Sequence, residues 1–319
     1  MRELTQAGLV LPGRPGVGPS DREIAKKLEI PSGTLRYRIR RLYSSGILKG
    51  SSAFPNPNLL GLKAGAYTVD VSPTHRKTDA VNKLKLIDGA MSIHNFIGSL
   101  VWITFVYEND EELSKKLDMM KNAAGAEGVL SSIPYPPCPV SLTQNQAELL
   151  LYLTKYGLTS YRELAKKLGV SVRTAERRLS DLVRNTCLLS LPRVNYSAMT
   201  GCVPADLLVL FRDLEALRKV QPSLFALLGD QIILAALWDV VGMCSLVLPN
   251  VSSVSEIAEK VKLLEGVVAA RVDIVKEHIE LTETYGAYIE QRMISRGLVR
   301  TPRSQEERHL HVSTKKLKV

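Results

Sequence analysis

Cysteine is scarce in this chain of 319 residues. The four cysteines are Cys138, Cys187, Cys202 and Cys244, and none stands at the paired spacings that hold zinc. They are also too few for the disulfide framework of a small secreted protein. The sequence therefore predicts free, buried thiols in a reducing compartment, and we expect the protein to be cytoplasmic.

Signatures of catalytic sites are missing as well. The chain contains no glycine-rich phosphate loop, no clustered metal ligands and no nucleophile motif. We therefore expect a protein that is not an enzyme, with no catalytic residues, no metal and no cofactor. A binding function is the leading hypothesis.

The sequence also lacks an uninterrupted membrane-spanning run and a charged leader followed by an apolar core. Its longest apolar run, 232–248, is broken by Asp239 and Gly242. A corresponding apolar stretch occurs near residues 91–107, and a buried β-hairpin explains both. We therefore expect no membrane partner and no signal peptide.

Acidic residues are outnumbered: 42 lysines and arginines face 32 aspartates and glutamates, which leaves a formal charge of +10 and a pI near 9.4. This surplus favours a polyanionic partner, and nucleic acid is the usual one. No amphipathic basic helix with an aromatic face points to a membrane surface instead.

The stretch 20–48, SDREIAKKLEIPSGTLRYRIRRLYSSGIL, reads as two short helices joined by a tight turn. Apolar residues recur at helical spacing on both sides of Pro31-Ser32-Gly33, which breaks the run. Outside its apolar stripe the second helix carries several arginines and almost no acid, as expected of a helix that meets phosphates and base edges. The pattern predicts the recognition helix of a helix-turn-helix. The alternative is a basic surface helix in an ordinary helical hairpin.

Repetition of this pattern favours the DNA-binding interpretation. At an offset of 140 residues it returns in the stretch 160–188, SYRELAKKLGVSVRTAERRLSDLVRNTCLL, and the register holds through Gly61 and Gly201. An internal repeat of this length indicates two consecutive copies of one architecture.

A different unit follows each helix-turn-helix. In the first copy we predict a strand, a helix, two strands folded near Gly98-Ser99, a helix and an edge strand at 64–71, 77–86, 93–107, 110–123 and 129–134. The second copy has the same order at 206–211, 214–228, 232–248, 253–264 and 267–281. This order, βαββαβ, is that of a ferredoxin-like domain.

The predicted fold is therefore α+β, with two winged helix-turn-helix domains alternating with two ferredoxin-like (βαββαβ) domains. Prolines and glycines within 12–16 end any first helix of the first copy early. The expected divisions are 1–61 for the first head, with a degenerate first helix, 62–138 for the first ferredoxin-like domain, 139–201 for the second head, 202–284 for the second ferredoxin-like domain and 285–319 for a basic tail.

The run I-A-K-K-L-x-I-x-S-x-T-L-x-x-R-I-x-x-L-x-x-x-G-I-L, followed by Leu60-Gly61 and a βαββαβ unit, resembles the Lrp/AsnC class of feast/famine transcription regulators. Both halves resemble it, over nearly all of 20–281. The resemblance implies a winged helix-turn-helix that reads DNA and a ferredoxin-like domain that dimerises. In many members that domain also binds an amino acid or similar small effector between subunits.

Individual positions carry the resemblance further. Arg38 and Arg178 stand at the family's recognition-helix arginine, which more often braces phosphate than reads a base. Ser171 stands at the family's helix-capping serine, whereas Pro31 replaces it in the first copy and leaves Ser32 as the expected cap.

The chain departs from the family in the central hairpin of the regulatory domain, where members commonly have Gly-x-x-Asp. Here Gly98 is followed by Val101 and Gly242 by Ser245 at the aspartate position. The carboxylate that could hold an amino group is missing twice. The effector-binding residues therefore stay unknown, and an amino-acid ligand is not expected.

We predict a sequence-specific regulator of transcription that binds double-stranded DNA, with both heads of one chain acting as a pseudo-dimer whose ferredoxin-like domains pair face to face. A homodimer or higher assembly and a small-molecule effector stay open. The expected phosphate contacts are Lys26, Lys27, Arg38, Arg41, Lys166, Lys167 and Arg178. The expected base contacts are Arg36, Tyr37, Arg40, Arg173 and Arg177, and Ser32, Thr34 and Thr174 are expected to contact DNA beside them.

Two alternatives use the same scaffold. Siroheme decarboxylases share the architecture and use histidine and basic residues in the regulatory-domain cleft, and His75, His94 and His278 lie in or near the sheet domains here. The other alternative is a sequence-blind DNA-binding or metabolite-sensing protein.

Overall fold

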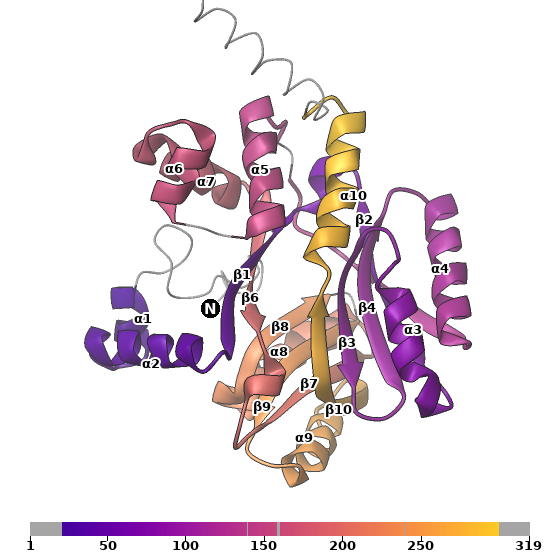
Figure 1. Ribbon diagram of the computed structural model, residues 1–319. Helices are drawn as coiled ribbons and strands as arrows, with labels where there is room; N and C mark the ends of the chain where they lie inside the picture. The colour runs from indigo at the N-terminus through magenta and orange to yellow at the C-terminus, as the bar shows by residue number, and fades with distance from the viewer. Residues whose placement is uncertain (1–20, 139, 158–159, 239, 300–319) are drawn as a thin grey trace, which may run out of the picture.

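The computed structural model describes residues 21–138, 140–157, 160–238 and 240–299 (Figure 1). Its elements form two helix-turn-helix heads, one large antiparallel sheet and a C-terminal helix. The α+β class and the alternation of heads with βαββαβ units are confirmed. The expected degenerate first helix and most of the basic tail lie outside these residues. No helix within them is long and apolar enough to cross a membrane.

The first sheet unit follows the predicted order closely. It comprises β2 (Lys63–Asp70), α3 (Lys77–Leu84), β3 (Ala90–Phe96), β4 (Leu100–Tyr107), α4 (Asp110–Ala124) and β5 (Gly128–Ile133), with short 3-10 turns at Pro57–Leu60 and Thr74–Arg76. Its strands lie in the order β5-β2-β4-β3. Helices α3 and α4 bury one face of the sheet, where Leu84 and Met120 pack against Ile103 and Phe105.

The second sheet unit repeats this arrangement. It comprises β7 (Val203–Phe211), α8 (Leu214–Leu228), β8 (Ile232–Trp238), β9 (Val241–Leu248), α9 (Ser252–Lys262) and β10 (Val267–Glu280), in the strand order β10-β7-β9-β8. A 3-10 turn at Gly229–Gln231 precedes β8. Alternate residues of β7, such as Leu207 and Val209, pack against Leu224 of α8 and Val261 of α9.

Strand β10 joins the two units into one eight-stranded sheet, a connection that the sequence did not indicate. Its first half pairs with β7, for example Val272 with Leu207, and its second half pairs with β3, for example Ile279 with Ile93. A strand of 14 residues is long enough to serve both partners. The halves of the chain are therefore linked by backbone hydrogen bonds as well as by side chains.

The helix-free surfaces of the two units also meet. Trp102 and Phe96 of the first unit belong to the same apolar cluster as Val275 of β10, with Leu208 and Met243 of the second unit packed against it. Side chains alternate between the two faces of a strand, so the residues that point away from the helices fill this cluster.

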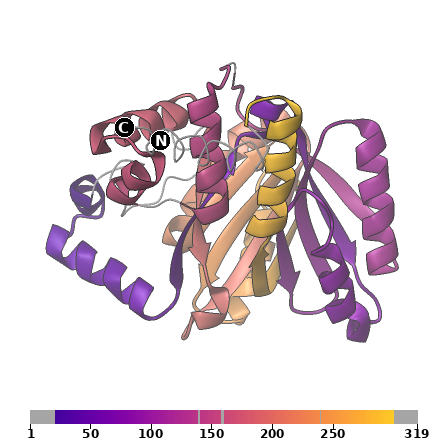
Figure 2. The same ribbon diagram turned by 45° about the horizontal axis from the view of Figure 1, so that its top comes forward.

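The wings of the two heads pair with each other. Strand β1 (Leu48–Pro55) follows the first head and β6 (Leu188–Val194) follows the second, and they form a two-stranded antiparallel ladder in which Ser52 faces Leu191 and Phe54 faces Leu189. The sequence predicted that each head has a wing, but not that the two wings pair with each other. This ladder connects the heads directly (Figures 1 and 2).

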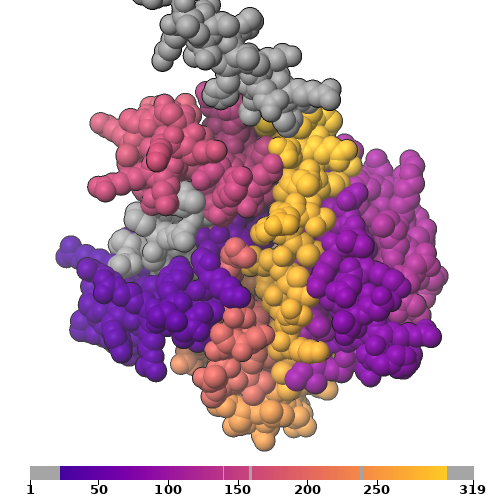
Figure 3. All heavy atoms as spheres, viewed as in Figure 1, coloured from indigo at the N-terminus to yellow at the C-terminus, as the bar shows by residue number. Residues whose placement is uncertain are grey.

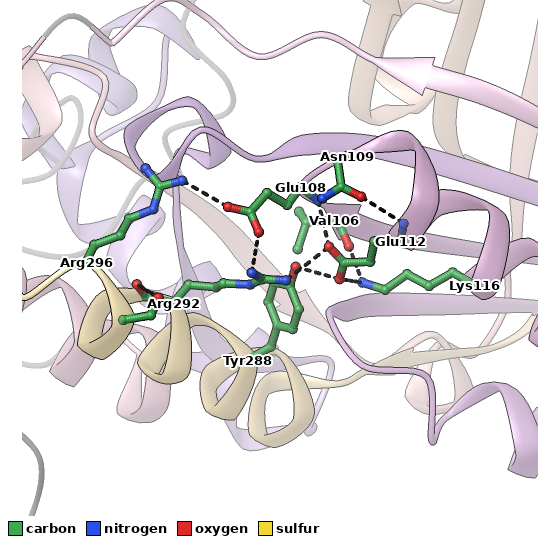
Figure 4. A network of polar contacts seen from close by, with 9 residues as sticks. Val106, Glu108, Asn109, Glu112, Lys116, Tyr288, Arg292 and Arg296 are labelled. Carbon is green, nitrogen blue, oxygen red and sulfur yellow. Dashed lines mark hydrogen bonds and ion pairs between the residues drawn. The ribbon is translucent and has the colours of Figure 1, made fainter.

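Helix α10 (Thr282–Ser295) lies along α5 and β3, at the surface of the molecule (Figures 1 and 3). Figure 4 shows how it is anchored: Arg292 pairs with Glu108 and with Glu112, whose Oε2 is 3.0 Å from Nη2. The Tyr288 hydroxyl donates to Glu112 over 2.8 Å. Burial would raise the pKa of Glu112, but hydrogen bonds from Lys116, the Glu108 backbone and Tyr288 bring it below its usual value.

The opposite side of α10 holds the second head. Lys155 at the end of α5 forms an ion pair with Glu290 over 2.6 Å. Tyr285 and Ile289 are fully buried in the same cluster as Leu150 of α5. Because one helix contacts both α5 and the first sheet unit, the second head is fixed to the sheet of the first half.

Candidate nucleic-acid interface

The second head is a complete three-helix unit with well-defined helix starts. It comprises α5 (Gln144–Tyr156), α6 (Tyr161–Leu168) and α7 (Val172–Arg184). Thr143 and Ser160 each open a helix with a capping box. Ser171 was expected to cap the recognition helix, and its hydroxyl accepts from the Thr174 backbone N–H over 3.2 Å.

Helix α7 buries one stripe and exposes the other. Ala175, Leu179 and Leu182 are buried in the head. Arg173 and Arg177 are exposed, as predicted for residues that reach outward, whereas Thr174 and Arg178 are half-buried at the edge of the stripe. This leaves two adjacent turns of the helix with basic side chains directed to solvent.

The first head contains α1 (Asp21–Lys27) and α2 (Ser32–Ser44). Leu35 is buried against Ile24 and Ala25. The predicted basic residues of α2 lie on its outer surface: Arg36, Tyr37, Arg38, Arg40 and Arg41 are exposed, and Thr34 is half-buried. Tyr37 is 65% exposed, which is unusual for a large aromatic side chain.

The expected cap of α2 is wrong. Ser32 is the first residue of the helix rather than the residue before it, and the structure shows no side-chain cap at Pro31. Proline favours the extended conformation of a residue that precedes a helix but has no side-chain acceptor to offer. The two recognition helices therefore start differently, α7 with a cap and α2 without one.

The heads also differ in how they are packed. Among residues 21–61, the described part of the first head, the helix pair has a buried core of Ile24, Ala25 and Leu35, whereas the core of the second head is continuous with β1 and α10. Two equivalent leucines show the difference: Leu42 is 38% exposed and Leu182 is 1% exposed. Within the described residues, the second head therefore has the more extensive buried core.

Four further basic residues stand in the last turn of the helix that precedes each recognition helix. Lys26 and Lys27 end α1, and Lys166 and Lys167 end α6. All four are exposed. Lys167 lies 6.0 Å from the Tyr152 ring, and its ammonium remains in solvent.

Most of this positive charge is uncompensated. Among the described residues, no ion pair involves Arg38, Arg40 or Arg41 of α2, nor Arg173 or Arg177 of α7. Both heads lie on the same side of the large sheet, joined by the β1–β6 ladder (Figures 1 and 2). The molecule therefore presents two basic helix-turn-helix surfaces from one frame.

A buried polar cluster was not found by sequence reasoning. Asp206 is fully buried at the junction of the two sheet units and accepts hydrogen bonds from Ser245 over 2.7 Å and from the His94 imidazole over 2.6 Å. The His278 ring centroid lies 4.4 Å from that of His94. Burial, then the neighbouring His94, lowers the pKa of His278 well below its usual value. His75 is exposed and does not join them.

The fold and the basic helices define a class: a protein with two helix-turn-helix heads, each followed by a βαββαβ unit. A family model described as winged helix-turn-helix DNA-binding matches residues 142–185, which is the second head.

Two curated relatives come from archaea. The chain is 28% identical over 113 residues to the HTH-type transcriptional regulator FL11 of Pyrococcus furiosus, which covers 35% of this chain and 75% of the relative. It is 29% identical over 116 residues to the HTH-type transcriptional regulator Ptr1 of Methanocaldococcus jannaschii, which covers 35% of this chain and 78% of the relative.

One solved structure shares the tandem layout over most of the chain. The siroheme decarboxylase NirDL in complex with an iron-uroporphyrin III analogue superposes with a TM-score of 0.50 and 12% identity, covering 92% of this chain and 97% of that one. At this identity the likeness concerns the fold. The comparisons and the architecture together support a likeness to Lrp/AsnC-type helix-turn-helix proteins, here in tandem form.

Proposed function

We propose that this protein binds double-stranded DNA at specific sequences and regulates transcription, with its two heads acting as an intramolecular pseudo-dimer. The observation that carries the proposal is the joint presentation of two basic recognition helices from one frame, through the β1–β6 ladder and the shared strand β10. The archaeal relatives, which are named as transcriptional regulators, support the same conclusion.

The two heads should read different bases. Positions 36, 37 and 40 of α2 hold Arg, Tyr and Arg, whereas the equivalent positions of α7 hold Glu176, Arg177 and Ser180. Because each base pair presents its own pattern of donors and acceptors in the major groove, unlike side chains select unlike half-sites. The operator should therefore be non-palindromic. Selection of bound genomic fragments tests this, and a perfect palindrome as the preferred site would contradict it.

Base-reading and phosphate-binding residues can be separated in the second head. Arg177→Ala should weaken binding to the preferred site by about 1–3 kcal/mol and relax specificity at one position. Lys166→Ala should lower affinity on every sequence and reduce the dependence on salt. Both side chains are exposed, so neither change should affect folding. Salt titrations on the preferred site and on random DNA measure the two effects; identical behaviour of the variants would contradict this division.

A second candidate function is tetrapyrrole chemistry, which is favoured by the fold shared with NirDL and by the adjacent His94 and His278 rings. Both histidines already lie in the junction between the sheet units, and His94 bonds Asp206. Absorption spectra with added iron-uroporphyrin test this candidate directly. An unchanged spectrum would rule out tetrapyrrole chemistry. A spectrum of bound iron-uroporphyrin, together with DNA binding that does not depend on sequence, would favour tetrapyrrole chemistry over transcription regulation.

A further inference from the structure

A cavity of about 320 Å³ lies at the turn between β3 and β4, beside the start of α3 and the second half of β10. The lining residues that matter for its chemistry are Thr74, Lys77, Thr78, Asn95, Gly98 and Lys276. They include two cations, two hydroxyls and an amide, and no carboxylate lines the cavity. It thus has the polar groups of a ligand site and the volume for a small metabolite.

Lys77 is an unusually buried lysine. Only 8% of the surface of this residue is exposed. Its Nζ donates hydrogen bonds to the carbonyl oxygens of Phe96 over 2.5 Å and of Gly98 over 2.7 Å. An ammonium has three donors, so one is left for the cavity. Burial, then the charge of Lys276, lowers the pKa of Lys77 to about 8. A bound anion in the cavity would stabilise the charged form of Lys77.

Lys276 reaches the same cavity from the other half of the chain. The pairing of β10 with β3 shifts between Val275 and Glu277, which places Lys276 at a bulge. Bulges redirect a side chain from the regular alternation of a strand. Among the described residues no ion pair involves Lys276, and it lies close enough to Lys77 for its charge to lower the pKa of that lysine. Two like charges thus converge on one cavity whose lining contains no carboxylate.

Asn95 supplies an independent indication of a ligand. It is 7% exposed, lines the cavity, and its Oδ1 has no hydrogen-bond partner. A buried polar atom without a partner is costly, so most such atoms in folded proteins are satisfied. Its amide can present either donors or an acceptor to a bound molecule, which suits an oxygen-rich ligand bearing a hydroxyl or a protonated oxygen.

The two carboxylates whose charges act on Lys77, Asp70 and Asp273, each have another partner. Asp70 accepts from the Ser99 hydroxyl over 2.6 Å, and Asp273 accepts from Arg271 over 2.8 Å. The corresponding helix of the second sheet unit begins at Leu214 where α3 begins at Lys77, so the lysine is not a feature that this fold requires. The arrangement is specific to one half.

We propose that this cavity binds a small anion that carries a carboxylate or phosphate group and no ammonium group, held between Lys77 of the first half and Lys276 of the second. An ammonium would meet two lysines and no free carboxylate, which disfavours a zwitterionic amino acid. This site goes beyond the DNA-binding function, because it needs neither head.

Calorimetric titration of the full-length chain tests the site, with citrate and inorganic phosphate as probes and glycine as the zwitterionic comparison. Lys276→Ala removes an exposed cation and should weaken binding of the better probe by about tenfold or more. Lys83→Ala is the matched control, an exposed lysine of the same helix that does not line the cavity, and should change affinity by less than about twofold. Lys77→Met should abolish binding, with its folding checked by circular dichroism.

A second readout identifies the group that responds. An anion beside Lys77 favours its charged form and raises its pKa from about 8, so binding near that pH should take up protons. Titrations in buffers of different ionisation enthalpy measure this uptake. Affinity for citrate and phosphate weaker than about 10 mM, equal loss in Lys276→Ala and Lys83→Ala, or preference for glycine would each overturn the proposal. No DNA is present, so the outcome is independent of the proposed regulatory function.

Discussion

Asp206 shows how a single residue connects the two halves. Ser245 stands where the resemblance to the Lrp/AsnC pattern led us to expect an aspartate, and it lies directly opposite Asp206 in the β7–β9 pairing. The carboxylate is thus present on the neighbouring strand, but Ser245 and His94 occupy both of its oxygens. A carboxylate engaged in this way holds the sheet units together and is not free to bind an amino group.

His278 should make stability depend on pH. Its folded-state pKa lies well below 6.5 because it is buried beside His94, so in the unfolded chain it binds a proton at a higher pH than in the folded one. Stability should therefore fall as the pH drops below about 6.5, with a slope of up to about 1.4 kcal/mol per pH unit from this group.

Urea unfolding at pH 7.5, 6.5 and 5.5, chosen as roughly evenly spaced points around the histidine pKa, measures this slope. His278→Phe keeps a ring of similar size and should reduce the slope. His75→Gln is the control, because His75 is exposed and contacts neither histidine. An equal slope in all three proteins would contradict the assignment to His278.

The two recognition helices illustrate what differs at the scale of the element. Helix α7 has a capping serine, a buried stripe and support from α5, whereas α2 starts after Pro31 without a side-chain cap. Their basic residues are similar in number and exposure. The same sequence pattern thus produced two helices that are held to different degrees.

Replacing each serine in turn should distinguish the capped helix α7 from the uncapped helix α2. Ser171→Ala deletes the acceptor for the Thr174 N–H and should reduce the free energy of unfolding by about 1 kcal/mol. Ser32→Ala is its counterpart on α2, where the structure shows no cap bond, and should stay within about 0.5 kcal/mol of the parent. Denaturant unfolding without DNA gives both values. A loss at Ser32 as large as that at Ser171 would show that α2 is capped after all.

Prediction was accurate for elements that carry their own pattern. The hairpins at 90–107 and 232–248 and the helices between strands follow from alternating or helical apolar spacing. The cap of α2 was misassigned because Ser32 offers the right side chain one residue too late, and only the backbone shows where the helix begins. Boundaries that depend on a single residue are less secure than periodic segments.

At the scale of the whole molecule, the relative position of the heads is set by contacts far apart in the chain. The β1–β6 ladder joins the two wings, β10 bridges the two sheet units, and α10 links α5 to the carboxylates Glu108 and Glu112. These contacts make the heads parts of one frame rather than domains on a flexible linker. Their spacing on DNA should accordingly be restricted.

An operator with altered spacing tests this restriction. Inserting about half a helical turn, roughly 5 bp, between the half-sites turns them to opposite faces of the DNA, so both heads cannot bind together. Affinity should then fall at least about 100-fold, towards that of a single half-site, because the second contact no longer benefits from high effective concentration. Gel-shift titrations measure it, with a substitution of equal length outside the half-sites as control. Unchanged affinity would mean that the heads bind independently.

The candidate interface was largely visible in the sequence, whereas the cavity was not. Arg36, Arg40, Arg173 and Arg177 are exposed because they fall off a helical apolar stripe, which spacing alone reveals. Lys77 and Lys276 are 199 positions apart by their numbering, and nothing in their neighbouring residues links them. They meet only because β10 pairs with β3 across the two halves.

The amino-acid sequence alone establishes the repeat, the order of its elements and the basic character of the two recognition helices, because these depend on local periodicity and composition. Tertiary structure decided which edges of the two sheets meet, which wing pairs with which, and which cations converge on one cavity. Those outcomes depend on hydrogen bonds between strands, and any exposed strand edge offers similar unpaired backbone groups, so local sequence does not single out the partner.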